Sequence, residues 1–245
     1  DTSQPKLYVL CGESDAVQVV TLTSTGAFSS QTLLATDLRP SAMELSTATN
    51  ALYITNYESN TLLRYHSVTN AFVSRTNIHE GPRDIVLNTA TNSVSIVHQN
   101  SVYLTQITSS GTATDIDTGT AGYTSVAVNT SSNRVFASNG SHRSFFYTPT
   151  MSLSSSGTSL TDTGHGSHVS VSSGASKAYI AYGDSDAVSI VAEAGTQTDV
   201  AVGNQPVFSL PVDSVSSVYV SNFMDDTLSV ISTSTNAVTA TITLT

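Results

Sequence analysis

Six side chains along this sequence have the chemistry to bind a ligand or a partner. They are two arginines, a tyrosine and three histidines: Arg39, Tyr57, Arg83, His98, His165 and His168. Guanidinium groups recognise carboxylates, and neutral imidazoles are common metal ligands. We therefore expect any binding site to be built from these residues. The most ligand-like stretch is 164–168, where two histidines alternate with small residues.

The same residues also have a purely structural interpretation. No pair of histidines shows a zinc-ligand spacing, and no cysteine accompanies them. Arg39 and Arg83 each lie beside a proline, at positions that we interpret as equivalent. Each arginine could receive a carboxylate in a central channel or pair with Glu44 or Glu80. Loop histidines that make ordinary hydrogen bonds remain the alternative to a ligand site.

No metal site or cofactor is predicted. The acidic pairs Asp184/Asp186 and Asp225/Asp226 could hold calcium, which takes carboxylate and carbonyl oxygens. Neither pair matches a calcium loop, and carboxylates that bond nearby backbone amides in turns explain both pairs equally well. Calcium or a transition metal is therefore an unsupported alternative.

Catalytic motifs are absent from the sequence. It contains no Gly-x-Ser-x-Gly nucleophile elbow and no glycine-rich phosphate loop that opens a helix. The single cysteine, Cys11, lies at the end of an apolar run and is interpreted as a packed residue. We therefore expect a protein that is not an enzyme.

A repeat positions all these loops. Six tetrapeptides occupy equivalent places in successive units: Tyr8–Cys11, Tyr53–Asn56, Ser95–His98, Phe136–Asn139, Tyr179–Tyr182 and Tyr219–Asn222. Their spacing of roughly 40–45 residues is typical of propeller blades. The second unit reads as four short strands rich in β-branched and aromatic residues, joined by Asn, Ser and Thr turns. Its fourth-to-first and second-to-third loops share one face, which carries the candidate residues.

The repeat resembles a known family. Tyr53–Asn56 followed by Asn60–Leu62, and Tyr219–Asn222 followed by Asp226–Ile231, are similar to the Tyr-Val-Thr-Asn (YVTN) β-propeller repeat. This resemblance implies a propeller fold and a setting outside the cytoplasm, as in surface-layer components, exported propellers and lactonase-like propellers. It implies no particular ligand.

We therefore predict an all-β fold: one six-bladed β-propeller domain, residues 1–245, with four-stranded antiparallel blades. The first unit starts at its second strand, so about 23 strands are expected and the first blade lacks its innermost strand. Three interpretations stay open: residues 1–5 form a stub, the blade has three strands, or another chain donates a strand by β-augmentation.

The amino-acid composition limits the classes of partner that the protein is expected to bind. The formal net charge is −10, and Lys6 and Lys177 are the only lysines. Phosphate binding needs clustered cations, so nucleic acid is excluded as a partner. No apolar run approaches the ~20 residues of a membrane helix, so direct membrane insertion is not expected. The Ser- and Thr-rich, lysine-poor composition and the start at Asp1 favour the periplasm, the cell surface or secretion.

Two functions follow as hypotheses. The first is a non-enzymatic, exported scaffold that binds partner proteins. The alternative is a small-molecule or metal-binding propeller, including a lactonase-like one, with its site at the channel mouth on the histidine-rich face. Two sequons, at Asn129 and Asn139, match the glycosylation pattern.

Overall fold

The computed structural model describes residues 5–139, 142–147, 152–159 and 166–244. These residues form 23 β-strands and two 3-10 helices, Gly12–Ser14 and Asp213–Val215, so the all-β expectation is confirmed. None of the helices in these ranges is long and apolar enough to span a membrane.

The strands form six antiparallel sheets in chain order. Sheets 1 to 3 consist of β1 (Lys6–Cys11), β2 (Ala16–Leu22) and β3 (Phe28–Ala35); β4 (Pro40–Ser46), β5 (Ala51–Asn56), β6 (Thr61–His66) and β7 (Phe72–Asn77); and β8 (Pro82–Asn88), β9 (Ser93–His98), β10 (Tyr103–Ile107) and β11 (Ala113–Asp117). Sheets 4 to 6 consist of β12 (Ser125–Asn129), β13 (Arg134–Ser138), β14 (His142–Tyr147) and β15 (Ser152–Ser159); β16 (Gly166–Ser172), β17 (Lys177–Tyr182), β18 (Ala187–Ala192) and β19 (Gln197–Ala201); and β20 (Pro206–Val212), β21 (Ser217–Asn222), β22 (Thr227–Ser232) and β23 (Ala237–Thr243).

Each sheet is a meander of neighbouring strands, as the alternating sequence predicts. The turn between β4 and β5 ends at Asn50, whose φ of 48° lies in the left-handed region. Asn92 and Asn133 repeat this geometry in sheets 3 and 4. Asparagine tolerates the left-handed region better than most residues do. The Thr-Ala-Thr-Asn type of turn thus sets where each second strand begins.

Successive sheets pack face to face, and alternate residues of each second strand contact opposite neighbours. Tyr53 packs in the core shared with sheet 3. Leu52 and Ile54 pack in the core shared with sheet 1. Tyr179 takes the place of Tyr53 in the core between sheets 5 and 6. Burying each large aliphatic residue contributes roughly 1.5–3 kcal/mol, so a sheet that is unstable alone is stabilised by its neighbours.

In sheets 1, 4 and 5, a cation at the start of the second strand joins the sheet to a turn of the next one. The Lys6 Nζ donates to the carbonyl oxygens of Ser67 and Val68 at 2.8 and 2.6 Å. Lys177 makes the corresponding bond to the Thr233 carbonyl at 2.5 Å. Arg134, at the same position in sheet 4, donates to the Glu193 carbonyl. Both lysines of the sequence therefore serve inter-sheet contacts, which explains why few cations remain on the surface.

The inner strands carry a second repeated contact. Asp84 of β8 accepts a hydrogen bond from the backbone N–H of Val126 at 2.9 Å. At the equivalent place, Ser125 of β12 accepts one from the Val169 N–H at 3.2 Å. His168 of β16 is placed in the same way, with Nδ1 at 3.4 Å from the Ser209 N. These side chains join the first strands of neighbouring sheets around the centre.

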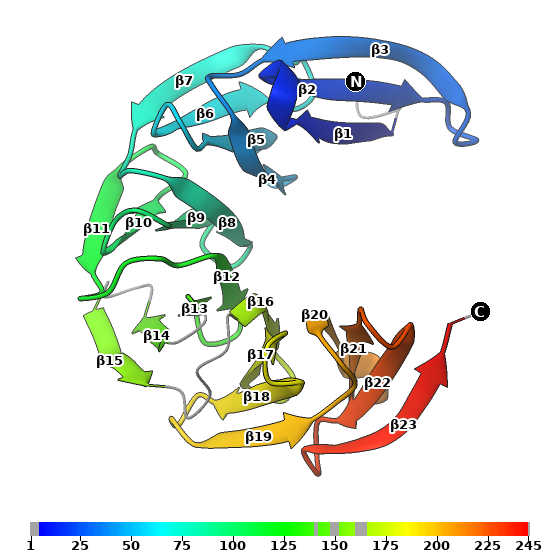
Figure 1. Ribbon diagram of the computed structural model, residues 1–245. Coiled ribbons are helices and arrows are strands. Elements are labelled where there is room, and N and C mark those ends of the chain that lie inside the picture. Colours follow the sequence, from blue (N-terminus) through cyan, green and yellow to red (C-terminus); the bar gives the residue numbers. More distant parts are fainter. Residues whose placement is uncertain (1–4, 140–141, 148–151, 160–165, 245) are drawn as a thin grey trace.

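The six sheets follow one another around an arc that is open between sheets 1 and 6 (Figure 1). The first strands of sheets 2 to 6 lie toward the centre, and the fourth strands lie at the rim. Five apolar cores join consecutive sheets, and the described residues contain no such core between sheets 6 and 1. The structure therefore gives the six expected sheets without a closed six-membered ring.

Sheet 1 has three strands, and β1 is its innermost one. The missing inner strand is therefore confirmed for the described residues. Pro5 continues the line of β1, because its carbonyl accepts the N–H of Leu22 at 2.8 Å. Residues 1–4, which the stub interpretation requires, lie outside the described residues.

Candidate functional site

Arg39 and Tyr57 lie in neighbouring loops at the same end of the strands, and their side chains are in contact. Arg39 follows β3, and Tyr57 follows β5, so both lie in loops of the predicted binding face. The guanidinium carbon of Arg39 lies 5.1 Å from the centre of the Tyr57 ring. Its Nη1 is 3.5 Å from the Glu58 carboxylate, and both charged side chains are more than half exposed. We name the group Arg39, Tyr57, Glu58, Gln99 and Asn100 the Arg39 patch.

Sheet 3 contributes amides to the Arg39 patch. The Tyr57 hydroxyl donates to the Gln99 side chain at 3.2 Å, and the Asn100 amide lies 3.4 Å from the same hydroxyl. The neighbouring loop exposes Leu38, which is 57% accessible. A hollow of about 340 Å³ beside the patch is lined by Gly12, Glu13, Asp15, Leu38, Arg39 and Glu58. The patch therefore offers a cation, an aromatic ring, amides and an apolar side chain on one surface.

The backbone of Arg39 is held by a contact that recurs in the repeat. Arg39 has a φ of 54°, and its N–H donates to the Asp15 carboxylate at 2.7 Å. Gly81 and Gln205 hold the same place before Pro82 and Pro206, and both also have positive φ. Their N–H groups donate to Asn60 and Asp186, each at 2.8 Å. The repeat thus fixes the loop, while the side chain at this place is free to vary.

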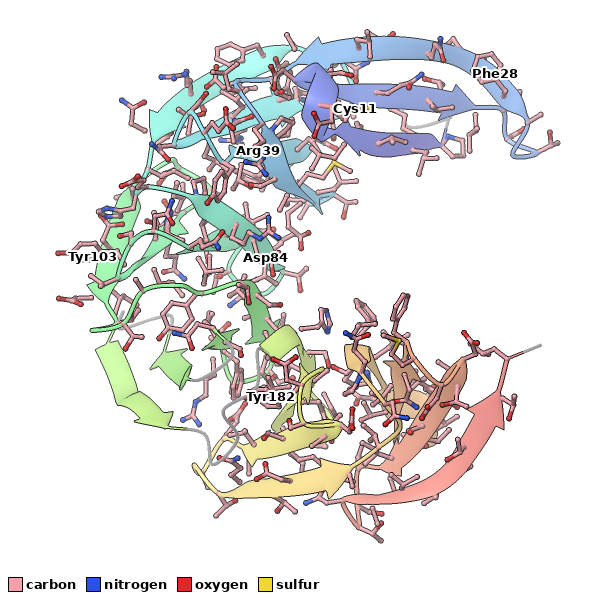
Figure 2. The ribbon with its side chains drawn as sticks, in the orientation of Figure 1. Cys11, Phe28, Arg39, Asp84, Tyr103 and Tyr182 are labelled. Atoms are coloured by element: carbon pink, nitrogen blue, oxygen red, sulfur yellow. The ribbon has the colours of Figure 1, made fainter. Side chains whose placement is uncertain are left out.

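Arg83 is not equivalent to Arg39. Pro40 pairs with Asn56 and Pro82 pairs with His98, so Gly81 corresponds to Arg39. Arg83 follows its proline, is exposed, and acts electrostatically on Asp84, whose carboxyl lies on the inner strand β8 (Figure 2). Arg39 pairs with Glu58 instead of the expected Glu44 or Glu80. The expectation that the two arginines share a position is therefore wrong.

Two partly buried carboxyls, Glu44 and Asp84, lie on the inner strands of sheets 2 and 3. Burial raises the pKa of Asp84, against the backbone N–H groups of Val126 and Ile85, which lower it. Burial also raises the pKa of Glu44, and the nearby charge of Asp84 raises it further. Both groups belong to inner strands, so they contribute to the contacts between sheets.

His98 does not open onto a channel mouth, in contrast to the expectation. Its side chain is fully buried, and its Nε2 is 3.1 Å from the hydroxyl of Thr105. Burial lowers the pKa of His98 to about 4. Asn222, at the equivalent place in sheet 6, donates to the hydroxyl of Ser229 at 3.0 Å. His98 therefore replaces the repeat asparagine in a contact between adjacent strands.

His168 contacts the neighbouring sheet and does not line the Arg39 patch. Its ring stacks on Phe208 with the ring centres 3.9 Å apart. Burial lowers the pKa of His168 to about 4, so the ring is neutral at pH 7. His165 lies outside the described residues. Of the six predicted site residues, the structure therefore brings together Arg39 and Tyr57, and it places Arg83, His98 and His168 in three separate environments.

A second polar cluster was not predicted. The Asp115 carboxylate is 3.0 Å from the Nε2 of His79 and accepts a 2.7 Å hydrogen bond from Thr105. His79 stacks on Tyr103, which Figure 2 shows at the outer side of sheet 3. A hollow of about 240 Å³ adjoins this His79–Asp115 pair. The pair therefore lies toward the rim.

A cross-strand signal in the repeat could have identified Asp115. Thr105 pairs with Asp115 in sheet 3, and Ser189 pairs with Asp199 in sheet 5. The Ser189 hydroxyl donates to Asp199 at 2.5 Å, as Thr105 does to Asp115. A hydroxyl on the third strand and an aspartate ten residues later on the fourth strand is thus a repeated contact. The histidine beside it is particular to sheet 3.

The acidic pairs have partners in the turns. Asp186 accepts the Gln205 N–H, and Asp225 accepts the N–H and the side-chain amide of Asn204 at 2.7 and 2.6 Å.

Asn129, the first residue of one predicted glycosylation sequon, is buried and donates to Glu193 at 2.6 Å. Across the described part of the chain, no three His, Cys, Asp or Glu side chains are grouped so as to hold a metal ion.

No family model matches the chain, and no curated protein matches its sequence. Solved structures do match. They include virginiamycin B lyase from Staphylococcus aureus (TM-score 0.78, 8% identity, 98% of this chain and 80% of that one), a streptogramin B lyase (0.76, 12%, 98% and 80%) and hydrazine synthase from Kuenenia stuttgartiensis (0.76, 11%, 97% and 83%). At such low identities the likeness establishes the fold alone, and the chain has a β-propeller fold.

Proposed function

We propose that this chain is an exported, non-enzymatic β-propeller module that binds a partner protein through the Arg39 patch. The observation that supports the proposal most strongly is the exposed Arg39 guanidinium held against the Tyr57 ring, beside the exposed Leu38. Arginine and aromatic residues are enriched at protein interfaces and carry much of their binding energy.

The loop geometry favours binding with little loss of conformational freedom. The backbone of Arg39 is fixed by Asp15, and the backbone of Leu38 is fixed by the Ser59 hydroxyl, which accepts the Leu38 N–H at 2.8 Å. A surface that is already ordered loses little entropy when a partner binds. The YVTN-like repeat and the lysine-poor surface support a location outside the cytoplasm.

Site-specific crosslinking tests this proposal. A photoreactive amino acid at Leu38, in cells of the source organism, should give a discrete protein adduct. Substitution Arg39→Ala should reduce the adduct at least fivefold, because the guanidinium supplies the charged contact at the centre of the patch.

The matched control places the same crosslinker at Ala48, which is exposed in a turn at the opposite end of the strands. No adduct should form there. Equal adducts from Leu38 and Ala48, or adducts that do not respond to Arg39→Ala, would contradict a specific site at the Arg39 patch.

A second candidate function is acid–base catalysis by the His79–Asp115 pair. The observation in its favour is the 3.0 Å contact of a carboxylate with a partly exposed imidazole beside a hollow. A carboxylate held against an imidazole orients the ring for proton transfer. Two similar structures are a virginiamycin B lyase and a streptogramin B lyase.

Incubation with virginiamycin B, followed by chromatography, tests this second function. Turnover that falls at least 100-fold in His79→Gln and is unchanged in His66→Gln would support it. His66 is a suitable control because its Nδ1 accepts a local backbone N–H, from Thr69, and it lies apart from the His79–Asp115 pair on β6. Unaltered turnover in His79→Gln would exclude the pair as the acid–base group for this compound.

A further inference from the structure

The outer face of sheet 1 exposes positions that are buried in every other sheet. Leu7 and Val9 of β1 are 54% and 40% accessible. The equivalent second-strand residues of sheets 2 to 6 are at most 2% accessible: Leu52 and Ile54, Val94 and Ile96, Val135 and Ala137, Ala178 and Ile180, Val218 and Val220. Leu33 of β3 lies on the same exposed face and is 67% accessible. This face therefore has the composition of an inter-sheet contact, and no sheet formed by the described residues packs against it.

Sheet 6 shows the reverse situation. Its Val218 and Val220 pack against sheet 5, and alternation places Tyr219 on the opposite face. Tyr53 and Tyr179, at this position, are 2% and 0% accessible, whereas Tyr219 is partly exposed. Leu210, its partner on β20, is 53% accessible. The face of sheet 6 that carries Tyr219 therefore exposes the residues that contact the next sheet elsewhere in the repeat.

Sheet 6 also carries, at its open side, the repeated side chain that accepts a backbone N–H from the next sheet. Asp15, Asn60 and Asp186 each follow a second strand with positive φ and accept the backbone N–H of the residue that leads into the next sheet. Asp226 has the same place in sheet 6, a φ of 51° and an exposed side chain. In addition, no strand of the described residues pairs with the inner edge of β1, where sheets 2 to 6 have a first strand.

We propose that the opening of the arc is the binding site for one further sheet of the same repeat, together with one strand that pairs with β1. The contact is continuous with the five interfaces already formed within the chain. The occupant has an aromatic anchor facing Leu7, Val9 and Leu33, and two aliphatic residues facing Leu210 and Tyr219. A cation two residues before that anchor donates to the Thr23 carbonyl, as Lys6 does to Ser67.

Three arguments favour a single further sheet over the alternatives. Direct closure of sheet 6 onto sheet 1 would cover both apolar faces but would leave β1 without an inner neighbour. A second copy that placed its own sheet 1 against sheet 6 would bring five more sheets into the space of one. The solved structures of the same fold also extend beyond the matched region by about a fifth of their length. A single sheet with one additional strand satisfies both faces and the free edge.

The chain itself provides a probe. Residues 36–88 contain one complete sheet and the next inner strand, β4 to β8, in their natural order. The 245-residue chain is co-expressed with a tagged copy of residues 36–88 as a separate polypeptide, and in a second experiment the same copy is fused after residue 245. Cys11 is partly buried, lies on the same face of β1 as Val9, and is the only cysteine of the sequence. Its labelling by a maleimide therefore reports whether the opening is filled.

The expected result is a 1:1 complex by native mass spectrometry, Cys11 labelling at least tenfold slower, and a melting temperature higher by roughly 10 °C in the fused form. A matched probe with Leu52→Asp and Ile54→Asp should not bind, because these residues would face Leu210 and Tyr219. The variant Val9→Asp in the 245-residue chain should also fail to bind the unaltered probe.

Three outcomes would overturn the proposal. Slow Cys11 labelling in the monomeric 245-residue chain alone would show that the arc closes on itself. A homodimer that is lost in Leu210→Asp would identify a second copy as the occupant. A fusion protein with the melting temperature and Cys11 labelling rate of the unfused chain would show that the opening does not accept a repeat sheet.

Discussion

The five interfaces inside the arc and the two faces at its opening have apolar residues at equivalent repeat positions. These residues are buried inside the arc and exposed at the opening. At the interface of sheets 5 and 6, Val220 is fully buried against Tyr179 and Ile190. At the opening, Val9 has the same repeat position and is 40% accessible. The sequence pattern therefore encodes a contact surface at every unit, and whether the surface is covered depends on the neighbour.

This difference separates the features that one repeat unit forms by itself from those that need two neighbouring units. The four strands of sheet 6 and the three strands of sheet 1 pair in the same meander, since strand pairing and turns depend on residues within one unit. Burial depends on two units, and it is missing only where the arc has no next member. In repeat proteins, stability is approximately a sum of terms within repeats and terms between neighbours. The opening isolates the second kind of term.

The largest expected effect comes from placing a charge at the two valines. Val220→Asp should lower the free energy of unfolding by more than about 4 kcal/mol, because a carboxylate would be buried without a partner. Val9→Asp should change it by less than about 1 kcal/mol, because water reaches that face. Urea denaturation of both variants measures the pair. Similar losses from both would show that the outer face of sheet 1 is covered in solution.

The pH dependence should differ between two interfaces that use the same repeat position. His168, between sheets 5 and 6, has a pKa lowered to about 4 by burial, from 6.5 in the unfolded chain. The unfolded state therefore binds more protons between pH 6.5 and 4, and stability falls as the pH falls through this window. The full shift corresponds to a loss on the order of 3 kcal/mol. His98 acts in the same direction.

Asp84, at the equivalent position between sheets 3 and 4, has a raised pKa and the opposite sign. Its buried charge costs stability at neutral pH, and protonation removes that cost as the pH falls. The variant His168→Ser, which introduces the residue found at this position in sheet 4, should reduce the slope of unfolding free energy against pH between 4 and 6.5. An unchanged slope in this variant would assign the acid sensitivity to other groups.

Part of this comparison could be predicted from the sequence. The tyrosine register predicted the sheets, the meander order and the missing inner strand, because these features follow from residues close together in the chain. The open arc could not be predicted, because the same Tyr219 that packs in a closed ring is also compatible with an absent neighbour. Only the accessibility of Leu7, Val9 and Leu210 distinguishes the two cases.

The candidate site was predictable to a smaller extent. The proline register correctly placed Arg39 on the loop face, and the contact with Tyr57 joins two adjacent loops. His98 was misplaced because a histidine at the position of a repeat asparagine gives no sequence signal of its burial. The His79–Asp115 pair joins the loop between sheets 2 and 3 to the fourth strand of sheet 3, and the repeat encodes the Thr105–Asp115 pair but not the position of His79.

A smaller difference is expected for the cations that fasten the sheets. Lys177→Met should cost about 1–2 kcal/mol, because the Thr233 carbonyl and the Asn236 side chain lose their donor. Ser217 has the same repeat position at the open face, and Ser217→Met should change the unfolding free energy by no more than about 0.5 kcal/mol. Thermal and urea unfolding measure both variants. A loss in Ser217→Met as large as that in Lys177→Met would indicate a neighbour at the opening.

The smallest effect concerns a single hydroxyl group. Tyr8 faces sheet 2, and its hydroxyl donates to the Ser67 carbonyl at 2.8 Å. Tyr8→Phe should therefore cost about 1 kcal/mol, the typical net value of one hydrogen bond. Tyr219→Phe should be neutral in the 245-residue chain, because its partly exposed side chain meets water at the opening. In the fusion protein that carries the additional copy of residues 36–88, the Tyr219 hydroxyl would face a turn of the added sheet, as Tyr8 faces Ser67. Tyr219→Phe should then cost as much as Tyr8→Phe, and a value that stays at zero would show that the added sheet does not reproduce the interface of sheets 1 and 2.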